Sequence, residues 1–378
     1  MAAIIPAGPA PATNTETRSG SMAEQQGVRQ QAAGSGQQLS YRFSVAPMLD
    51  YTDRHFRVLM RQISRHSLLY SEMVVAQALH HARQEPDAAK RGERLERLIG
   101  FDPIEKPLAL QLGGDDPGLL AEAVGLAADW GYDEVNLNLG CPSEKVRKGR
   151  FGACLMADPH QVARCIEAMA AASPLPVTVK QRIGIDDLDS YAELLNFVDT
   201  LAAAGCRRFA VHARKAWLDG LDPKQNRSIP PLRYELVHQL KRERPKLTIE
   251  INGGLQTLAD CQSQLAQVDG VMVGRAVYDQ PLRWARVDSD IHGDHSAAAL
   301  ARSEISPSMV LRGLLPYADE WCRGGGKLWP IARHLVHLVA GVSGARRWRQ
   351  SISQEAGAKS AGAEVLEAAA LSLEQRGY

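Results

Sequence analysis

From Phe43 onward, short apolar segments alternate with longer segments of helical character. A parallel sheet covered by helices produces this alternation, because each strand is followed by a helix that packs on it. One helix is expected to begin at Asp116-Pro117, a cap and first-turn pair, and to stop at Gly131. Eight strands are predicted: Phe43 to Met48, Leu68 to Ser71, Leu108 to Leu112, Glu134 to Leu139, Val177 to Arg182, Phe209 to His212, Leu247 to Asn252 and Gly270 to Gly274. Eight such units favour an α/β fold of the closed (β/α)8 TIM barrel type over an open doubly wound sheet.

The pattern changes at both ends of the chain. Residues 1–40 are rich in Ala, Gly, Gln, Ser and Thr and contain no aromatic residue, so they are predicted to be a disordered N-terminal tail. After about Ser289 no further strand is expected, and three stretches have helical character: Ser308 to Trp321, Leu328 to Ala340 and Ala345 to Ile352. The predicted organisation is a tail over 1–40, a barrel over 41–290 and a C-terminal all-helical domain over 291–378.

Composition narrows the class of protein. Of the 378 residues 45% are hydrophobic and 23% charged, and no apolar run approaches the roughly 20 residues of a membrane span. The six cysteines show no C-x-x-C spacing, so neither a disulfide framework nor a metal site is expected. With no secretory or transit pattern at the start, a reduced, cytoplasmic protein is predicted.

The formal net charge of +1 conceals an uneven distribution. Between Ala301 and Gln350 there are eight Lys or Arg residues against three acidic ones. The C-terminal region is therefore the candidate for contact with an anionic partner.

Polar residues end several of the predicted strands, where the active site of such a barrel forms. Gly253 and Gly254 follow the seventh strand and Gly274 and Arg275 follow the eighth, the two strands whose loops commonly hold a phosphate through backbone N–H groups. Each glycine pair alone would be better explained as a plain turn. Together, at these two strands, they favour a phosphate site.

Three further strand-end side chains suggest a bound ring system. An ammonium at Lys180 in the barrel mouth needs an anionic or electron-rich partner, such as the N1–C2=O edge of a reduced flavin, or else an ion pair with a carboxylate such as Glu72. His212 is either a structural histidine or a donor to the same flavin edge. Gln111 either hydrogen-bonds the polar rim of the ring or satisfies a loop backbone.

Cys141 stands in a Gly-Cys-Pro loop directly after a strand, where a thiol would be exposed at the barrel mouth. A cysteine chosen at random is more often inert packing. This position makes Cys141 the strongest single catalytic candidate, whereas Cys154, Cys165, Cys206 and Cys261 are expected to pack.

These residues resemble the tRNA-dihydrouridine synthase family, and most of all its A-type members. The similarity extends from Phe43 nearly to the C-terminus. The matching motifs, in order, are Ala46-Pro47-Met48-Leu49-Asp50-Tyr51-Thr52-Asp53, Leu137-Asn138-Leu139-Gly140-Cys141-Pro142-Ser143, Val179-Lys180-Gln181-Arg182-Ile183-Gly184, Val211-His212-Ala213-Arg214, Asn252-Gly253-Gly254, and the A-type segments Lys215-Ala216-Trp217-Leu218, Pro223-Lys224-Gln225-Asn226-Arg227 and Ile229-Pro230-Pro231-Leu232. Tyr51 departs from the family, in which tryptophan is frequent at this position.

The resemblance implies an FMN cofactor that is reduced by NADPH, with NADH as the other possible reductant. It implies that hydride then passes to C6 of a uracil while Cys141 protonates C5, which is chemically reasonable because hydride addition builds enolate charge that an acid must quench. The implied FMN-binding residues are Pro47, Met48, Leu49, Gln111, Lys180, His212, Asn252, Gly253, Gly254, Gly274 and Arg275.

The implied substrate is tRNA, bound at its D-loop and elbow, with uridines at about positions 20 and 20a flipped into the barrel. Asn138 and Arg182 are expected to hydrogen-bond the uracil edge. The expected contacts outside the pocket are Lys224, Arg227, Arg346 and Arg349, although a pair of solvated charges is the ordinary explanation for residues of this kind. A monomer that needs no protein partner is expected.

Two rival functions remain open at the level of sequence. An FMN barrel acting on a free pyrimidine would share the strand-end residues but would not need the basic helical region. An RNA-binding or chaperone-like module would need tRNA binding but not the thiol of Cys141.

Overall fold

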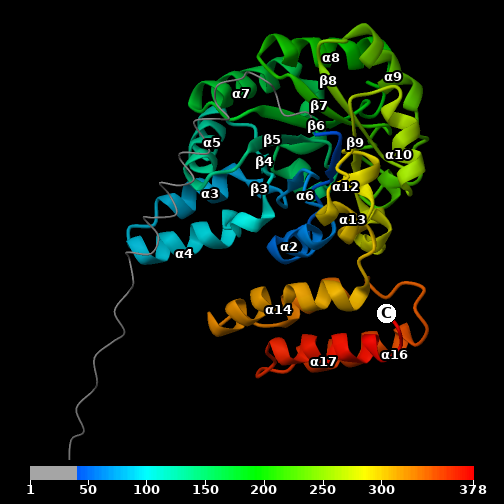
Figure 1. Cartoon of the computed structure of the whole chain (residues 1–378). Coiled ribbons are helices and arrows are strands. Elements are labelled where there is room, and N and C mark those ends of the chain that lie inside the picture. Colours follow the sequence, from blue (N-terminus) through cyan, green and yellow to red (C-terminus); the bar gives the residue numbers. More distant parts are fainter. Residues whose placement is uncertain (1–40) are drawn as a thin grey trace, which may run out of the picture. The chain divides into compact units, whose positions relative to one another are not determined.

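The computed structural model describes residues 41–378, so the predicted tail over 1–40 lies outside the described residues. Within residues 41–378 the expected α/β barrel is confirmed: parallel strands alternate with helices and curl into a nearly closed cylinder. Figure 1 shows the helices around the strands, with α14, α16 and α17 forming further layers after the barrel elements.

All strand pairs of the sheet are parallel, in the order β1-β9-β8-β7-β6-β5-β4-β2. The short strands β2 and β3 both pair with β4 and together occupy one position of the barrel, and a bridge between Ser44 and Leu68 brings β1 beside β2. The strands are β1 Phe43–Val45, β2 Leu69–Tyr70, β3 Val74–Val75, β4 Leu108–Gly113, β5 Glu134–Leu139, β6 Val177–Arg182, β7 Arg208–His212, β8 Thr248–Asn252 and β9 Gly270–Val273.

The helices begin and end where local chemistry requires. Asp116 accepts a hydrogen bond from the backbone N–H of Leu119 and Gly131 ends the helix with φ 85°, so the predicted start and stop of α5 are confirmed. The α-helices are α2 Arg54–Ile63, α3 Ala76–Arg83, α4 Ala88–Ile99, α5 Pro117–Trp130, α6 Glu144–Lys148, α7 Pro159–Ala172, α8 Tyr191–Ala203, α9 Tyr234–Glu243, α10 Leu258–Leu265, α11 Arg275–Asp279, α12 Val287–Asp290, α13 Ala297–Ser303, α14 Pro307–Arg323, α15 Trp329–Leu335, α16 Ala345–Ala356 and α17 Ala363–Glu374. Short 3-10 helices are η1 Pro103–Glu105, η2 Gly152–Ala157, η3 Gln225–Arg227 and η4 Pro281–Trp284.

The barrel interior contains a cluster of three buried charged side chains. Arg208 on β7 bridges two buried carboxylates, at 3.0 Å from Glu134 and 3.2 Å from Glu250. Ser44 and Thr178 donate further hydrogen bonds to these carboxylates, at 2.5 and 2.7 Å. Because a buried charge is costly unless it is paired and hydrogen-bonded, these contacts offset the cost of burying the three charges, while Nε of Arg208 has no hydrogen-bond partner among residues 41–378.

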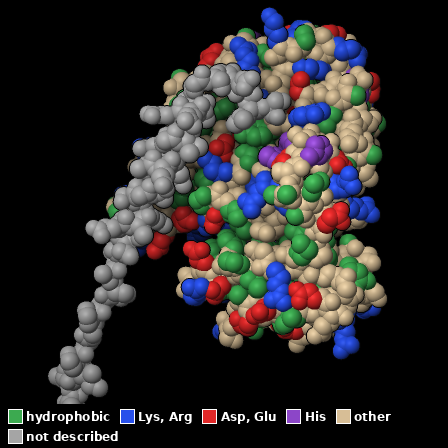
Figure 2. Space-filling view, in the orientation of Figure 1, with side chains coloured by type: hydrophobic (Ala, Val, Ile, Leu, Met, Phe, Trp, Pro, Cys, Tyr) green, Lys and Arg blue, Asp and Glu red, His purple; other side chains and the backbone are tan. Residues whose placement is uncertain are grey.

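The C-terminal helices pack through apolar faces, among them Leu314 of α14 and Leu366 of α17, both buried. Their outer faces carry mixed charge, such as the Arg312–Glu374 ion pair, and Figure 2 shows acidic and basic side chains side by side there.

The helices of the C-terminal region differ in part from those expected. The helix predicted from Leu328 to Ala340 is shorter, since α15 ends at Leu335, and α13 and α17 were not predicted. No helix among residues 41–378 is long and apolar enough to cross a membrane. The boundary at residue 290 stays a prediction.

Candidate active site at the carboxyl ends of the strands

Five predicted site residues lie on four neighbouring strands at the same end of the barrel. Asn138 on β5 is in register with Lys180 on β6, and His212 on β7 is in register with both Arg182 on β6 and Asn252 on β8. Residues two apart on a strand face the same side of the sheet, so Lys180 and Arg182 share one face. The sheet therefore brings these side chains to one mouth.

Asn138 connects strand β4 to the loop that carries Cys141. Its Nδ2 donates to Oε1 of Gln111 at 2.8 Å, and its Oδ1 accepts the backbone N–H groups of Gly140 and Cys141 at 3.2 and 2.9 Å. Gln111 in turn donates from Nε2 to Asn136 at 2.8 Å. Gln111 and Asn138 are thus linked to each other and to the cysteine loop, a connection that sequence alone did not indicate.

The Cys141 loop is held at several points. The carbonyl of Cys141 accepts the backbone N–H of Ala153 at 2.9 Å, and its Sγ lies 3.5 Å from the hydroxyl of Ser143, which also caps α6. Gly152 has φ 79°, and a Cβ there would lie 2.6 Å from the Cys141 carbonyl oxygen. Cys141 itself is partly exposed, so the thiol is fixed in place yet accessible.

Lys180 lies in an electropositive environment. Burial, together with the neighbouring charge of Arg182, lowers the pKa of Lys180 to about 8, although Cys141 and Glu250 act in the opposite direction. The alternative ion pair with Glu72 is not found among residues 41–378, where Glu72 instead accepts the backbone N–H of Asp50 at 2.5 Å. Lys180 is therefore free to meet an anionic ligand.

His212 is neutral, since burial and the charges of Arg182 and Lys180 hold its pKa well below the usual range. Its ring packs on the backbone of Gly253, where φ is 110° and a Cβ would lie 2.6 Å from His212 Cδ2. Asn252 donates from Nδ2 to the carbonyl of Met272 at 2.7 Å. Only glycine allows the chain to turn this closely beneath the ring.

Cations gather at the rim near the predicted phosphate loops. The pKa values of Arg214 and Arg227 are both lowered, first by burial and then by the charge of Arg275. Like charges raise each other's free energy unless an anion lies among them, so this arrangement suits a phosphate. Met48 lies close by, with its sulfur 3.3 Å from the position of a Cβ on Gly274.

Arg182 is more engaged in the protein than expected. Its guanidinium is buried and donates to the carbonyls of Gly140, Lys215 and Asn226 at 2.8, 2.9 and 3.1 Å. Buried Asn226 donates to the carbonyl of Trp217 at 2.9 Å. Arg182 therefore joins the cysteine loop to the segment after β7, a role that its position beside Lys180 did not reveal.

Several of the remaining predicted residues are exposed, and Pro47 is partly buried. Lys224 and Arg227 stand at η3 in the segment after β7, and Arg346 and Arg349 lie on α16. Leu49 is 65% exposed in the loop after β1, and Pro47 is partly buried beside it.

The residues present fit a flavin mononucleotide. Gly253 lets the backbone approach the His212 ring closely, Arg275 is exposed directly after Gly274, and Lys180 has no ion-pair partner among residues 41–378. Among residues 41–378 no group of acidic, histidine or cysteine side chains is arranged to hold a metal ion.

Known proteins are similar to this chain over most of its length. The family model described as "Dihydrouridine synthase (Dus)" matches residues 44–374. A protein named tRNA-dihydrouridine(20/20a) synthase from Synechocystis sp. is 53% identical over 328 residues, which is 86% of this chain and 92% of the relative. Proteins of the same name from Shewanella oneidensis and Escherichia coli K12 are 48% and 47% identical, covering 88% and 87% of this chain and 94% and 90% of the relatives.

Proposed function

Because the chain belongs to the dihydrouridine synthase family, whose members are flavin enzymes, we propose that it reduces uridines 20 and 20a of tRNA to dihydrouridine. One arrangement carries the proposal: the Cys141 loop is fixed by hydrogen bonds and lies beside basic residues at the carboxyl ends of the strands. Asn138 fixes the Cys141 loop and is in register with Lys180, and Arg182 donates to the carbonyl beside Cys141.

FMN would be held by its phosphate at Gly253, Gly254, Gly274 and Arg275 and by its ring at Lys180 and His212. The loop residues Pro47, Met48 and Leu49, with Gln111 and Asn252, would complete the ring site. Bound FMN, reduced by NADPH, supplies the hydride that reaches C6 of the uracil. The ammonium of Lys180 favours the negative charge of the reduced ring, and neutral His212 serves as a hydrogen-bond partner without adding charge.

Cys141 supplies the proton at C5. The thiol gives up its proton to the carbon that carries the enolate electron pair, so the C6–H and C5–H bonds replace the ring double bond. The backbone N–H of Cys141 donates to Asn138 Oδ1, and the N–H of Ala153 donates to the carbonyl of Cys141; these bonds fix the loop and limit the thiol to a narrow range of positions.

The tRNA would meet the protein at two places. Asn138 and Arg182 contact the flipped uracil, and Lys224 and Arg227 contact the backbone around it. Arg346 and Arg349 on α16 hold more distant phosphates of the elbow. The enzyme acts as a monomer in the cytoplasm and needs no protein partner.

Replacement of Cys141 by alanine tests the proposal. Loss of the acid should lower dihydrouridine formation about 100- to 10 000-fold, while tRNA affinity and the rate of flavin reduction by NADPH stay unchanged. Dihydrouridine is mapped by position on unmodified tRNA. Cys154→Ala is the matched control, since Cys154 is also partly exposed and lies on η2, and it should leave the rate unchanged.

The same variant separates the rival functions. An RNA-binding module whose chemistry is dispensable would lose nothing with Cys141→Ala. Purified wild-type protein that carries no flavin, or that forms no dihydrouridine with NADPH and tRNA, would contradict the proposed function itself.

A further inference from the structure

The loop after β1 is a compact unit that ends at Asp53. Met48 accepts backbone hydrogen bonds from Tyr51 and Thr52 at 3.1 and 3.0 Å, and its own N–H donates to the Thr52 hydroxyl at 3.0 Å. From below, Arg57 donates to the carbonyl of Thr52 at 2.8 Å. Because these bonds tie the ends of the loop together, Asp53 keeps a fixed position relative to Met48, a proposed flavin contact.

Asp53 carries more hydrogen bonds than a helix cap needs. Its Oδ1 accepts the N–H of Phe56 at 3.0 Å, which caps α2 in the ordinary way. It also accepts from Nε2 of His334 at 2.9 Å on Oδ1 and from Arg333 at 2.5 Å on Oδ2. Asp116, by contrast, caps α5 through Leu119 alone. The two added donors on Asp53 both come from α15.

The contact is largely shielded from water. The side chain of His334 is 1% exposed and that of Asp53 is 18% exposed. Burial alone would raise the pKa of Asp53, but the hydrogen bond and charge of His334 hold that pKa well below its usual range. A charged hydrogen bond in such surroundings is stronger than one on the surface.

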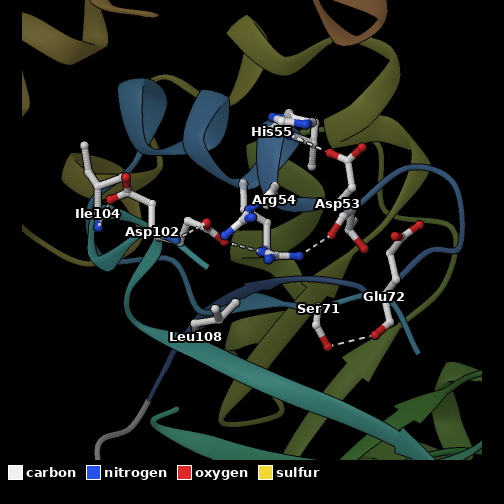
Figure 3. A network of polar contacts seen from close by, with 12 residues as sticks. Asp53, Arg54, His55, Ser71, Glu72, Asp102, Ile104 and Leu108 are labelled. Carbon is white, nitrogen blue, oxygen red and sulfur yellow. Dashed lines mark hydrogen bonds and ion pairs between the residues drawn. The ribbon is translucent and has the colours of Figure 1, made fainter. Parts of the chain in front are cut away.

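Two further contacts, one through Tyr278 of α11 and one through α14, lie around the loop and the start of α2. Tyr278 lies 3.2 Å from Nδ1 of His334 and packs edge-on against Tyr51, with ring centroids 4.5 Å apart. The Nδ1 atom of His55 lies 2.8 Å from the hydroxyl of Tyr317 on α14. Figure 3 shows Asp53 and His55 at the start of α2, with Glu72 nearby.

We propose that Asp53 is a positioning residue for the reaction: it fixes α15, and through it α16, relative to the flavin-contacting loop at the barrel mouth. Helix α16 packs against α15 and carries the proposed tRNA contacts Arg346 and Arg349. A tRNA held by α16 then presents its D-loop at a fixed distance from Cys141. This inference rests on the proposed function.

Asp53→Asn tests the inference, because asparagine still caps α2 but removes the charge that faces Arg333 and His334. The KM for tRNA should rise about tenfold, as expected for one weakened charge-assisted hydrogen bond. Flavin content and the rate of flavin reduction by NADPH should not change, because the flavin site keeps its residues. Asp116→Asn makes the same chemical change at a cap without partners on α15 and should leave KM unchanged.

Arg333→Gln removes the charge of the donor instead of the acceptor in the same contact, so the inference can still be tested if Asp53→Asn does not fold. It should raise KM by a similar factor, and the double variant should be no worse than the more impaired single variant. A KM for tRNA within twofold of wild type in both variants would overturn the inference, and so would loss of bound flavin in parallel with the KM change. Failure of wild-type protein to form dihydrouridine would instead overturn the proposed function.

Discussion

Lys180 is a residue whose charge favours ligand binding but lowers the free energy of unfolding of the protein without ligand. Its ammonium is largely removed from water and lies beside the cation Arg182, which together lower its pKa from 10.5 to about 8. Below pH 8 both the folded and the unfolded chain hold the proton, so the folded state bears the full cost of the buried charge. Between pH 8 and 10.5 the unfolded chain binds more protons, so the stability of the protein without flavin should rise with pH.

Lys180→Met should therefore stabilise the flavin-free protein at pH 7 by about 1 to 3 kcal/mol, with a smaller effect at pH 10. The same change should weaken flavin binding at least about tenfold, because the anionic edge loses its partner. Urea unfolding at the two pH values and a flavin titration measure both effects. Lys246→Met removes an exposed lysine before β8 and should alter neither; a less stable Lys180→Met protein would contradict the argument.

At the residue scale, sequence predicted which side chains end the strands but not what they bind within the protein. The position of Asn138 three residues before Cys141 places both at the mouth, yet its hydrogen bonds to two loop N–H groups depend on how the loop turns. The acceptors of Arg182 include Asn226, 44 positions away, which no local pattern reveals. Asp53 belongs to the motif after β1, and its partners on α15 are about 280 positions away, beyond the reach of any local pattern.

At the scale of elements, the turn that supports Cys141 depends on one glycine. Gly152 opens η2 with φ 79°, and a Cβ there would lie 2.4 Å from Val146 Cγ1 and 2.6 Å from the Cys141 carbonyl oxygen. A substitution must therefore push the cysteine loop away from η2. The hydrogen bond from Ala153 to the same carbonyl would lengthen with it.

Gly152→Ala should reduce the rate of uridine reduction about 10- to 100-fold, because displacing a reacting group by about 1 Å can cost that much. Flavin reduction by NADPH, measured by loss of flavin absorbance, should keep its wild-type rate. Gly293→Ala provides the control, since Gly293 has a similar φ of 72° but nothing within 4 Å of its Cβ position. Equal losses in the two variants would attribute the effect to backbone strain alone.

The predicted bounds of helices and strands agree with the structure where capping residues and glycines next to the boundary determine them. The cap at Asp116 and the positive φ at Gly131 bound α5 as expected, and β5 and β6 have the predicted limits. Strand β1 ends at Val45, before the expected Met48, because the chain turns there into the loop closed by Thr52. Helix α15 is shorter than predicted, and its apolar composition alone gave no sign of where the last turn would unwind.

At the scale of the whole molecule, a net charge of +1 conceals separate cationic regions. The charge of Arg275 contributes to lowering the pKa values of both Arg214 and Arg227, and Arg346, Arg347 and Arg349 are exposed on α16. Elsewhere many basic side chains are paired, as Arg312 is with Glu374 and Arg244 with Asp199. Paired cations contribute little to attracting a polyanion, so the unneutralised regions should dominate tRNA binding.

This distribution predicts how salt affects the protein. Each phosphate contact releases counterions, so the logarithm of tRNA affinity should fall linearly with the logarithm of salt concentration. Arg346→Gln and Arg349→Gln should each make that slope shallower by about one unit, because each removes one proposed contact. Arg65→Gln, an exposed arginine just beyond the C-terminal end of α2, should leave the slope unchanged. A free-pyrimidine reductase would show almost no salt dependence of substrate binding, so a flat profile in wild-type protein would favour that rival over tRNA reduction.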